Sequence, residues 1–170
     1  MKYKEPEGLN DVAQFHETFG MPILDSPQIP DAKRCALRVS LLQEELDELK
    51  EAIENDDLVE VADALCDLQY VLSGAILEFG MADSFKEMFD EVQRSNMSKT
   101  CKSMQEALDT QDHYQKSRDT KSFVAKKNGE FLVYREGDQK VLKSVKYSPA
   151  NIKAIVDGNV LVGQGTGNSK

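Results

Sequence analysis

Histidine and cysteine, the usual ligands of zinc and common residues of nucleophilic active sites, are scarce in this sequence of 170 residues. The two histidines, His16 and His113, lie far apart, which argues against a histidine-rich zinc site and against a Ser-His-Asp triad. The three cysteines, Cys35, Cys66 and Cys101, are odd in number and form no CxxC pair. We therefore expect free thiols in a reducing cytosol, with the two in helical patterns buried as small hydrophobic residues.

Glycine-rich nucleotide-binding motifs and long apolar runs are also absent. Neither GxxxxGK[ST] nor GxGxxG occurs, so neither a P-loop nor a Rossmann site is indicated. No apolar run approaches the roughly 20 residues that a membrane-spanning helix requires. Residues 1–6 contain no apolar segment of the kind found in signal peptides. We expect a cytoplasmic protein of one domain with a small appendage and no membrane partner.

Carboxylates are the most abundant charged groups. The chain has 30 Asp and Glu against 21 Lys and Arg, a formal net charge of −9. This balance argues against binding to nucleic acid, because such binding depends on Lys and Arg displacing counterions. Residues 41–67 hold eleven carboxylates and a single base, Lys50. Since like charges three or four positions apart on a helix repel one another, this cluster needs a counterion, and a divalent metal is the simplest one.

Apolar spacing predicts five helices in the first 120 residues. They cover residues 9–19, 32–54, 58–79, 84–94 and 103–117. Asp31 is placed to cap the second helix, and Gly20 and Gly80 are placed to end the first and third. Ser103 and Glu106 form a capping-box pattern at the start of the fifth.

After residue 120 the pattern changes to short strands. Residues 122–125 and 130–134 flank Asn128-Gly129, a strong hairpin signal, and residues 141–145 predict a third strand. Ser148-Pro149 is expected to start a short helix through Ile155.

The predicted fold class is mainly α: an antiparallel helical bundle with a small C-terminal β-meander. The predicted domains are a helical catalytic domain (1–120), a small β-meander and short helix packed on it (121–162), and a flexible Gly/Ser-rich tail (163–170).

The acids of the second and third predicted helices form stripes. At about 100° per residue, Glu44, Glu45 and Glu48 adjoin the buried face of one helix, and Glu60 and Asp63 share one stripe of the next. The short connection predicts antiparallel packing, so Glu45 and Glu48 should face Glu60 and Asp63. Carboxylates this close cannot all stay ionised without a cation, and their oxygens suit a hard ion such as Mg²⁺. The pattern favours metal-assisted attack on a polyphosphate.

A structural interpretation of Glu60 stays open at this point. Asp57 and Glu60 also fit a capping box, in which Glu60 would only bond the backbone at the start of its helix.

Three motifs in order resemble a known superfamily. Glu44-Glu45-x-x-Glu48 is followed twelve residues on by Glu60-x-x-Asp63, and later by Ser95-Asn96-Met97-Ser98-Lys99. With residues 64–74, 91–94, 140–143 and 147–149, they resemble the MazG-like all-α NTP pyrophosphohydrolase superfamily. Its relatives include dimeric dUTPase and phosphoribosyl-ATP pyrophosphohydrolase. The resemblance covers most of residues 15–155.

The resemblance implies hydrolysis of an NTP or dNTP to the monophosphate and pyrophosphate, with house-cleaning of the nucleotide pool as the setting. It implies that Mg²⁺, for which Mn²⁺ can substitute, is held by Glu45, Glu48, Glu60 and Asp63. Glu44 would be the general base or assist the metal.

The resemblance also implies partners. Asn96 and Lys99 would reach the nucleotide, and Asp67, Arg94 and Tyr70 are further candidates for substrate contacts. Members of the superfamily are usually dimers or tetramers, so we expect a homodimer or homotetramer.

Several alternatives stay open. The substrate could be phosphoribosyl-ATP, although residues 95–99 resemble the other branch. The chain could be a non-catalytic helical interaction module whose acids only recruit a cation or a basic partner. Asp67 could pair with a nearby base, and Tyr70 could be a core aromatic residue. Residues 101–134 have no assigned role.

Overall fold

The computed structural model describes residues 3–165 and the side chains of residues 3–158. The chain divides into two compact units, residues 1–86 with 154–170 and residues 87–153. Six helices and one two-stranded antiparallel sheet make up the regular structure of the described residues. The predicted class, mainly helical with a small C-terminal β element, is therefore confirmed.

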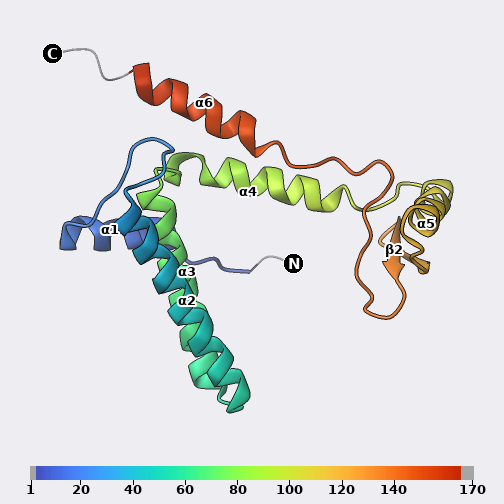
Figure 1. Ribbon diagram of the computed structural model, residues 1–170, viewed down its shortest axis with the longest axis horizontal. Helices are drawn as coiled ribbons and strands as arrows, with labels where there is room; N and C mark the ends of the chain where they lie inside the picture. Colours follow the sequence, from blue (N-terminus) through green and yellow to red (C-terminus); the bar gives the residue numbers. More distant parts are fainter. Residues whose placement is uncertain (1–2, 166–170) are drawn as a thin grey trace. The chain divides into compact units, whose positions relative to one another are not determined.

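Three helices build most of the first unit: α1 (Gly8–Phe19), α2 (Ala32–Glu54) and α3 (Leu58–Glu78) (Figure 1). The Asp31 carboxylate caps α2 by accepting hydrogen bonds from the backbone N–H groups of Lys33 (2.9 Å) and Arg34 (3.1 Å). Such a cap satisfies N–H groups that have no partner within the helix. Predicted and observed boundaries of these helices agree to within one residue.

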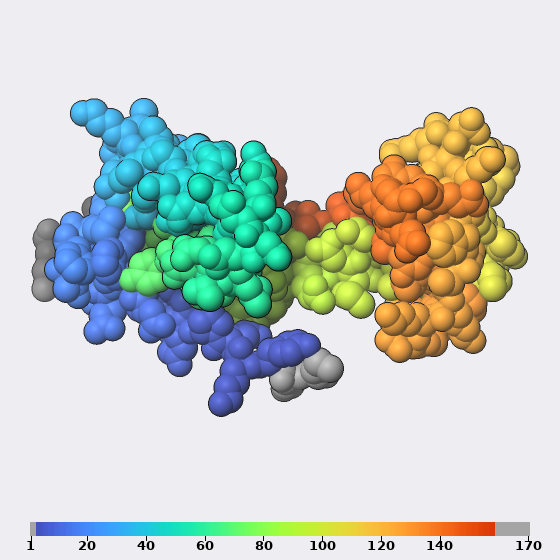
Figure 2. Space-filling model, turned by 90° about the horizontal axis from the view of Figure 1, so that it is seen from below, coloured from blue at the N-terminus to red at the C-terminus, as the bar shows by residue number. Residues whose placement is uncertain are grey.

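Helices α2 and α3 form an antiparallel hairpin. Only residues 55–57 connect them, and they lie side by side in both views (Figures 1 and 2). Buried Ala52 and Ala64, 5% and 3% exposed, lie on the facing sides of the two helices. Small side chains there allow the two backbones to approach closely.

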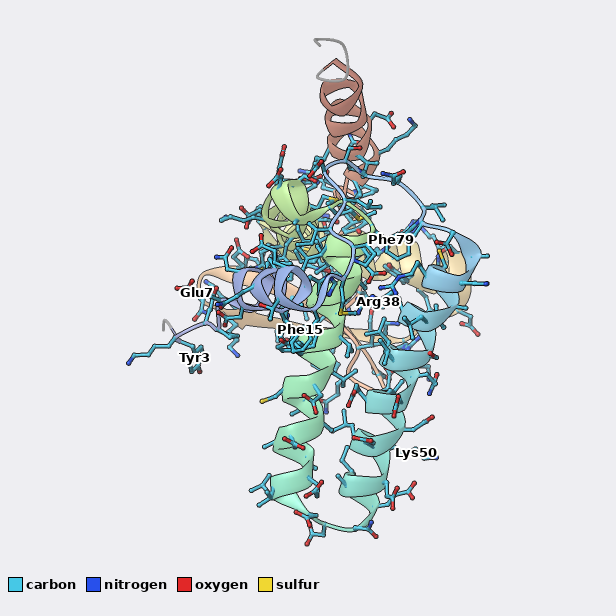
Figure 3. All side chains as sticks on the ribbon, turned by 90° about the vertical axis from the view of Figure 1, so that its left-hand side faces the viewer. Tyr3, Glu7, Phe15, Arg38, Lys50 and Phe79 are labelled. Atoms are coloured by element: carbon cyan, nitrogen blue, oxygen red, sulfur yellow. The ribbon has the colours of Figure 1, made fainter. Side chains whose placement is uncertain are left out.

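A buried ionic network ties the three helices together. Glu78 of α3, 1% exposed, accepts hydrogen bonds from Arg34 and Arg38 of α2, and Arg38 also contacts His16 Nε2 of α1 at 3.2 Å. Figure 3 shows Arg38 between α2 and α3. His16 Nδ1 lies 2.8 Å from the carbonyl oxygen of Pro22. Each buried charge thus has an opposite charge or a hydrogen-bonding partner, as burial requires.

The segment between α1 and α2 is held against the end of α3. The backbone N–H of Leu24 donates to Leu77 O, and that of Gln28 donates to Phe79 O, both at 3.1 Å. Gly80 follows with φ 67°, and a Cβ added to it would lie 2.0 Å from Ser26 O. Only glycine fits this close approach in a left-handed conformation.

The second unit contains α5 (Met104–Arg118), β1 (Ser122–Lys127) and β2 (Glu130–Arg135). Helices α4 (Ala82–Met97) and α6 (Ile152–Gly165) each have residues in both units. The hairpin turns at Asn128 (φ 53°) and Gly129 (φ 84°), as their sequence predicts. Both strands contact α5, and Figure 2 shows this part of the chain in yellow and orange. Its core is Cys101, Ala107, Val133 and Leu142.

The predicted third strand does not form, which is a correction. Residues 141–145 contribute one isolated bridge, between Tyr134 and Val141. Their backbone binds α5 side chains instead: the Lys143 N–H donates to the Tyr114 hydroxyl and the Val145 N–H to Thr110 Oγ1. These side-chain acceptors replace the backbone ladder of a strand.

The predicted short helix at 148–155 begins later and runs longer. Pro149 O accepts from Arg94, and the Asn151 N–H donates to Glu91 Oε1 at 2.8 Å, so these residues bind α4 and α6 begins at Ile152. The first residues of the predicted flexible tail, 163–165, are the last turn of α6. Residues 166–170 of that tail lie outside the described residues. The division into a catalytic domain (1–120) and an appended 121–162 stays a prediction, because it concerns function.

Two smaller expectations can be compared with the structure. The cysteines are free, but Cys66 is exposed, so the prediction that it is buried was wrong. In the part of the chain that the structure describes, no helix is both long enough and apolar enough to cross a membrane.

Candidate active site

The α2–α3 hairpin has an acidic face. Leu49 and Ala52 of α2 face α3. Successive residues of a helix are about 100° apart around its axis, so the residue before each inward-facing position points to one side of the hairpin. In an antiparallel pair, the residues just before the inward Val61, Ala64 and Leu68 of α3 lie on that same side. The acidic face consists of Glu44, Glu48, Glu51, Glu60, Asp63 and Asp67. The one base of this region, Lys50, projects from α2 away from α3 (Figure 3) and does not neutralise that face.

The opposite side of the hairpin is apolar. By the same geometry, the residues just after inward positions of the two helices lie there. Six of the residues on this side are large aliphatic residues that repeat every seven positions on each helix and are between 41% and 80% exposed: Val39, Leu46, Ile53, Leu58, Leu65 and Leu72. These six side chains form the apolar face of the hairpin.

A cavity of about 340 Å³ opens on the acidic face near the 55–57 turn. Five acidic residues are among those that line it: Glu48, Glu51, Asp57, Glu60 and Asp63. Three of the four residues predicted to bind metal, Glu48, Glu60 and Asp63, thus meet at one cavity, as the antiparallel packing predicts.

Glu45, the fourth of these residues, occupies an inward position and is half-buried. Its pKa is raised above the ordinary value, first by burial and then by the charges of Asp67, Glu48, Glu44 and Asp63. Carboxylates repel one another in this way only when they are close together. Glu44 and Asp67, two residues of the acidic face, therefore lie near enough to the inward Glu45 to raise its pKa.

The capping-box interpretation of Glu60 is only half realised. Asp57 Oδ1 accepts from the N–H groups of Val59 (3.0 Å) and Glu60 (3.2 Å), so Asp57 caps α3. In a full capping box the Glu60 carboxylate would also accept a hydrogen bond from the Asp57 N–H. Here the Asp57 N–H donates to Ala52 O instead, at 3.0 Å. Glu60 is one of the residues that line the cavity, and it lies in the first turn of α3, where the helix dipole favours negative charge.

Tyr70 takes part in an aromatic contact. Its ring lies edge-on to that of Phe15 in α1, with ring centroids 5.7 Å apart. Figure 3 shows Phe15 beside α1 and α3. Tyr70 is 40% exposed, so one part of the side chain packs against α1 and another part meets solvent. A substrate contact by Tyr70 stays a prediction.

The remaining predicted substrate contacts belong to the 87–153 unit. Arg94 binds Glu91 through two hydrogen bonds (2.6 and 2.8 Å) and lowers the pKa of Glu91 to about 2, together with the Asn151 N–H. Lys99 Nζ donates to Asn96 Oδ1 at 2.7 Å. Asn96 and Lys99 are thus paired with each other, and contact with a nucleotide stays a prediction for both.

Two cavity residues were not singled out from the sequence. Glu51 and Asn55 line the cavity beside Glu48. Glu51 lies three residues after Glu48, and this helical spacing would have placed it on the acidic face. Asn55 ends α2, and helical periodicity gives no signal for a residue outside the helix.

The donor set of this face fits a hard divalent cation chemically, since every candidate ligand is a carboxylate and the groups repel one another. In the described residues, no three Asp, Glu, His or Cys side chains already converge closely enough to hold an ion together. Glu48, Glu60 and Asp63 are exposed, so packing does not fix their rotamers.

Comparison with known proteins identifies a family match. The sequence profile of the phosphoribosyl-ATP pyrophosphohydrolase family matches residues 12–96, half of the chain. An uncharacterized protein of Acanthamoeba polyphaga mimivirus is 34% identical over 76 residues, which are 42% of this chain and 30% of that protein. The match to this relative therefore spans less than a third of the relative's length.

The match to the family profile defines the class as the MazG-like superfamily of all-α NTP pyrophosphatases. Within it, the chain belongs to the phosphoribosyl-ATP pyrophosphohydrolase family, whose members are hydrolases acting on phosphoanhydride bonds. The matched residues include Glu44 and the four predicted metal ligands, and they end at Asn96, before Lys99.

Proposed function

We propose that this chain is a Mg²⁺-dependent nucleoside triphosphate pyrophosphohydrolase that converts an NTP or dNTP to the monophosphate and pyrophosphate. The observation that carries the proposal is the cavity on the acidic face, lined by Glu48, Glu60 and Asp63 within the residues that match the family. Removal of surplus or non-standard nucleotides is the proposed setting.

Glu45, Glu48, Glu60 and Asp63 would hold the metal ion. Mg²⁺, when bound, neutralises charge on phosphate oxygens and orients water. The four carboxylates come from both helices of the hairpin, so its antiparallel packing sets their spacing. Ala52 and Ala64 let α2 and α3 approach closely at the level of the cavity.

Glu44 is the proposed general base. It precedes Glu45, lies on the acidic face one turn before Glu48 and is exposed to solvent. Its carboxylate would accept a proton from the attacking water. The water oxygen then forms a bond to phosphorus as the α–β anhydride bond breaks, which yields the monophosphate and pyrophosphate.

Phosphoribosyl-ATP is the second candidate substrate, because the matched family carries that name. We favour a simple NTP or dNTP because residues 95–99 resemble the other branch of the superfamily. Both reactions break the same kind of anhydride bond, so the acidic face would serve either substrate.

A substrate panel tests the proposal. The full chain is incubated with Mg²⁺ and with each common NTP and dNTP, dUTP and phosphoribosyl-ATP, and nucleotide products and pyrophosphate are quantified. The proposal expects equal amounts of monophosphate and pyrophosphate from at least one NTP or dNTP. Turnover of phosphoribosyl-ATP alone would select the second candidate. Binding of Mg²⁺ without turnover of any compound would leave a non-catalytic cation-binding module.

We also propose that the chain forms a homodimer or homotetramer through the apolar face. Six large aliphatic side chains at seven-residue spacing on an antiparallel hairpin form a surface that a second copy can match. Fully burying such a side chain contributes about 1.5–3 kcal/mol. The acidic face lies on the opposite side of the hairpin and would stay open in such an assembly.

A further inference from the structure

A second cavity, of about 420 Å³, lies in the 87–153 unit. Its charged lining consists of Lys99, Arg118, Arg135, Lys140 and Lys143, and no carboxylate is among the described residues that line it. Its volume falls within the roughly 300–1,000 Å³ of small-molecule sites. The net charge of the chain is −9, so a cavity with only basic charged residues departs from the overall composition.

Most of these cations keep their charge uncompensated. Arg135 forms an ion pair with Asp138. In the described part of the chain, the other four form no ion pair with a carboxylate. Arg118 lies 5.6 Å from the centroid of the Tyr114 ring, and Lys143 Nζ lies 4.3 Å from that of Tyr147. The ring contacts orient Arg118 and Lys143, and the hydrogen bond to Asn96 Oδ1 orients Lys99. None of these contacts neutralises a positive charge.

The positive field of the cavity acts on its neighbours. The Tyr147 hydroxyl lies 2.9 Å from Ser95 Oγ. This hydrogen bond, and after it the charges of Lys143 and Lys99, lower the pKa of Tyr147, although burial opposes them. Two of the cavity cations thus contribute to the lowered pKa of this neighbouring hydroxyl.

The backbone that carries two of these lysines is fixed in place. Lys140 O accepts from the Arg135 N–H at 2.9 Å, and the Leu142 N–H donates to Val133 O at 2.8 Å. Leu142 is part of the buried core of the unit, and the Lys143 N–H donates to the Tyr114 hydroxyl. Lys140 and Lys143 are therefore presented from an ordered segment, which reduces the entropy lost when a ligand binds.

We propose that this basic cavity binds the phosphate chain of a polyphosphate ligand, either a nucleoside triphosphate or free pyrophosphate. Lysine supplies point charges, and arginine supplies a planar fork that matches phosphate oxygens. Several adjacent phosphoryl groups provide the multiple negative charges that four uncompensated cations match. The inference goes beyond the proposed hydrolysis, because the acidic face contributes no lining residue and Lys99, a predicted nucleotide contact, is the one charged lining residue that the resemblance gives a role.

Calorimetry with the full chain tests this inference. Pyrophosphate, inorganic phosphate, a nucleoside triphosphate and the matching nucleoside are titrated with a metal chelator present, so that hydrolysis does not interfere. We expect pyrophosphate and the triphosphate to bind, the nucleoside not to bind, and both affinities to fall as salt is added. Binding of the triphosphate together with the nucleoside, but not of pyrophosphate, would show that the base is recognised and would overturn the inference.

Charge-matched variants locate the binding. Lys140→Gln with Lys143→Gln should weaken pyrophosphate binding at least about tenfold, because charge-assisted hydrogen bonds are lost. Lys126→Gln with Lys127→Gln removes the same charge from the β hairpin, outside the cavity, and should leave the affinity within about twofold of the parent chain. Equal weakening in the two pairs would refute the assignment to this cavity.

Two further variants separate this inference from folding and from catalysis. Lys140→Arg with Lys143→Arg keeps both charges and should retain binding. Glu48→Gln should retain pyrophosphate binding even where hydrolysis is lost. Loss of binding in either variant would contradict the inference, and thermal melts confirm that each variant is folded.

Discussion

Gly74 lies against the buried guanidinium of Arg38. A Cβ added there would lie 2.6 Å from Arg38 Nη1 and 3.1 Å from His16 Nε2. Arg38 is 5% exposed and bound to Glu78, so it cannot swing away without breaking a buried ion pair. The absence of a side chain at this one position is therefore a packing requirement.

We predict that Gly74→Ala destabilises the chain by about 1–3 kcal/mol, despite the roughly 1 kcal/mol by which alanine favours a helix. Urea unfolding measures this change. Gly158→Ala, in α6, is the matched control, since nothing lies within 4 Å of its added Cβ. Equal stability changes in the two variants would contradict the close packing at Gly74.

The sequence predicts some of the important residues and misses others. Glu48, Glu60 and Asp63 follow from helical spacing, because periodicity and a short turn suffice to bring them to one face. The Glu78 network was not foreseen, because its hydrogen bonds join residues about 40 positions apart and a glutamate at a helix end gives no local signal. Periodicity places residues on a face, but it does not pair long-range charges.

At the scale of elements, the Glu78 network also makes stability depend on pH. Burial alone would raise the pKa of Glu78, but hydrogen bonds from Arg38 and Arg34 outweigh it and hold the pKa below its ordinary value. The folded chain therefore keeps Glu78 ionised at pH values where the unfolded chain has bound a proton. The stabilisation is complete above the ordinary glutamate pKa and is lost as pH falls through the lowered one.

We predict that the free energy of unfolding of the parent chain falls as the solution is acidified through this range, and that Glu78→Gln shows a shallower dependence. At neutral pH the variant should lose about 3–5 kcal/mol, because two arginines remain without their buried partner. Urea unfolding at a series of pH values measures both effects. If the free energy of unfolding changed with pH to the same extent in the parent and in Glu78→Gln, Glu78 would be excluded as the source of the pH dependence.

The elements themselves were predicted best where local chemistry decides. The caps at Asp31 and Asp57 and the Asn128-Gly129 turn act over a few residues, and the structure contains all three. The third strand failed because Thr110 and Tyr114, more than 25 positions away, provide competing hydrogen-bond partners. Local pattern predicts a strand here, and tertiary contacts decide against it.

At the scale of the whole molecule, the hairpin separates two proposed functions onto opposite faces. The acidic face would hold the metal ion, and the apolar face would bind a second copy. The helical wheel of α3 alone predicts this separation, because its acidic and aliphatic stripes are distinct. The acidic residues of α2 and α3 lie on the same side of the hairpin because the two helices pack antiparallel, and the same packing brings their aliphatic residues together on the other side.

We predict that Leu46→Glu with Leu65→Lys raises the dissociation constant of the homo-oligomer at least about a hundredfold, because each buried aliphatic side chain contributes more than a tenfold effect. Sedimentation velocity over a range of concentrations measures it. Leu108→Glu, at an exposed leucine of α5, is the control and should leave association unchanged. A monomeric parent chain would contradict the proposed role of the apolar face.

The most direct test of the central claim is the Mg²⁺-dependent release of pyrophosphate from the best NTP or dNTP of the substrate panel. Asp63→Asn should lower kcat at least about a hundredfold, since it removes one charged ligand from the proposed site. Asp47→Asn, which makes the same change on α2 outside the cavity lining, should retain parent activity. Undiminished turnover by Asp63→Asn, or equal loss in both variants, would contradict hydrolysis at the acidic face.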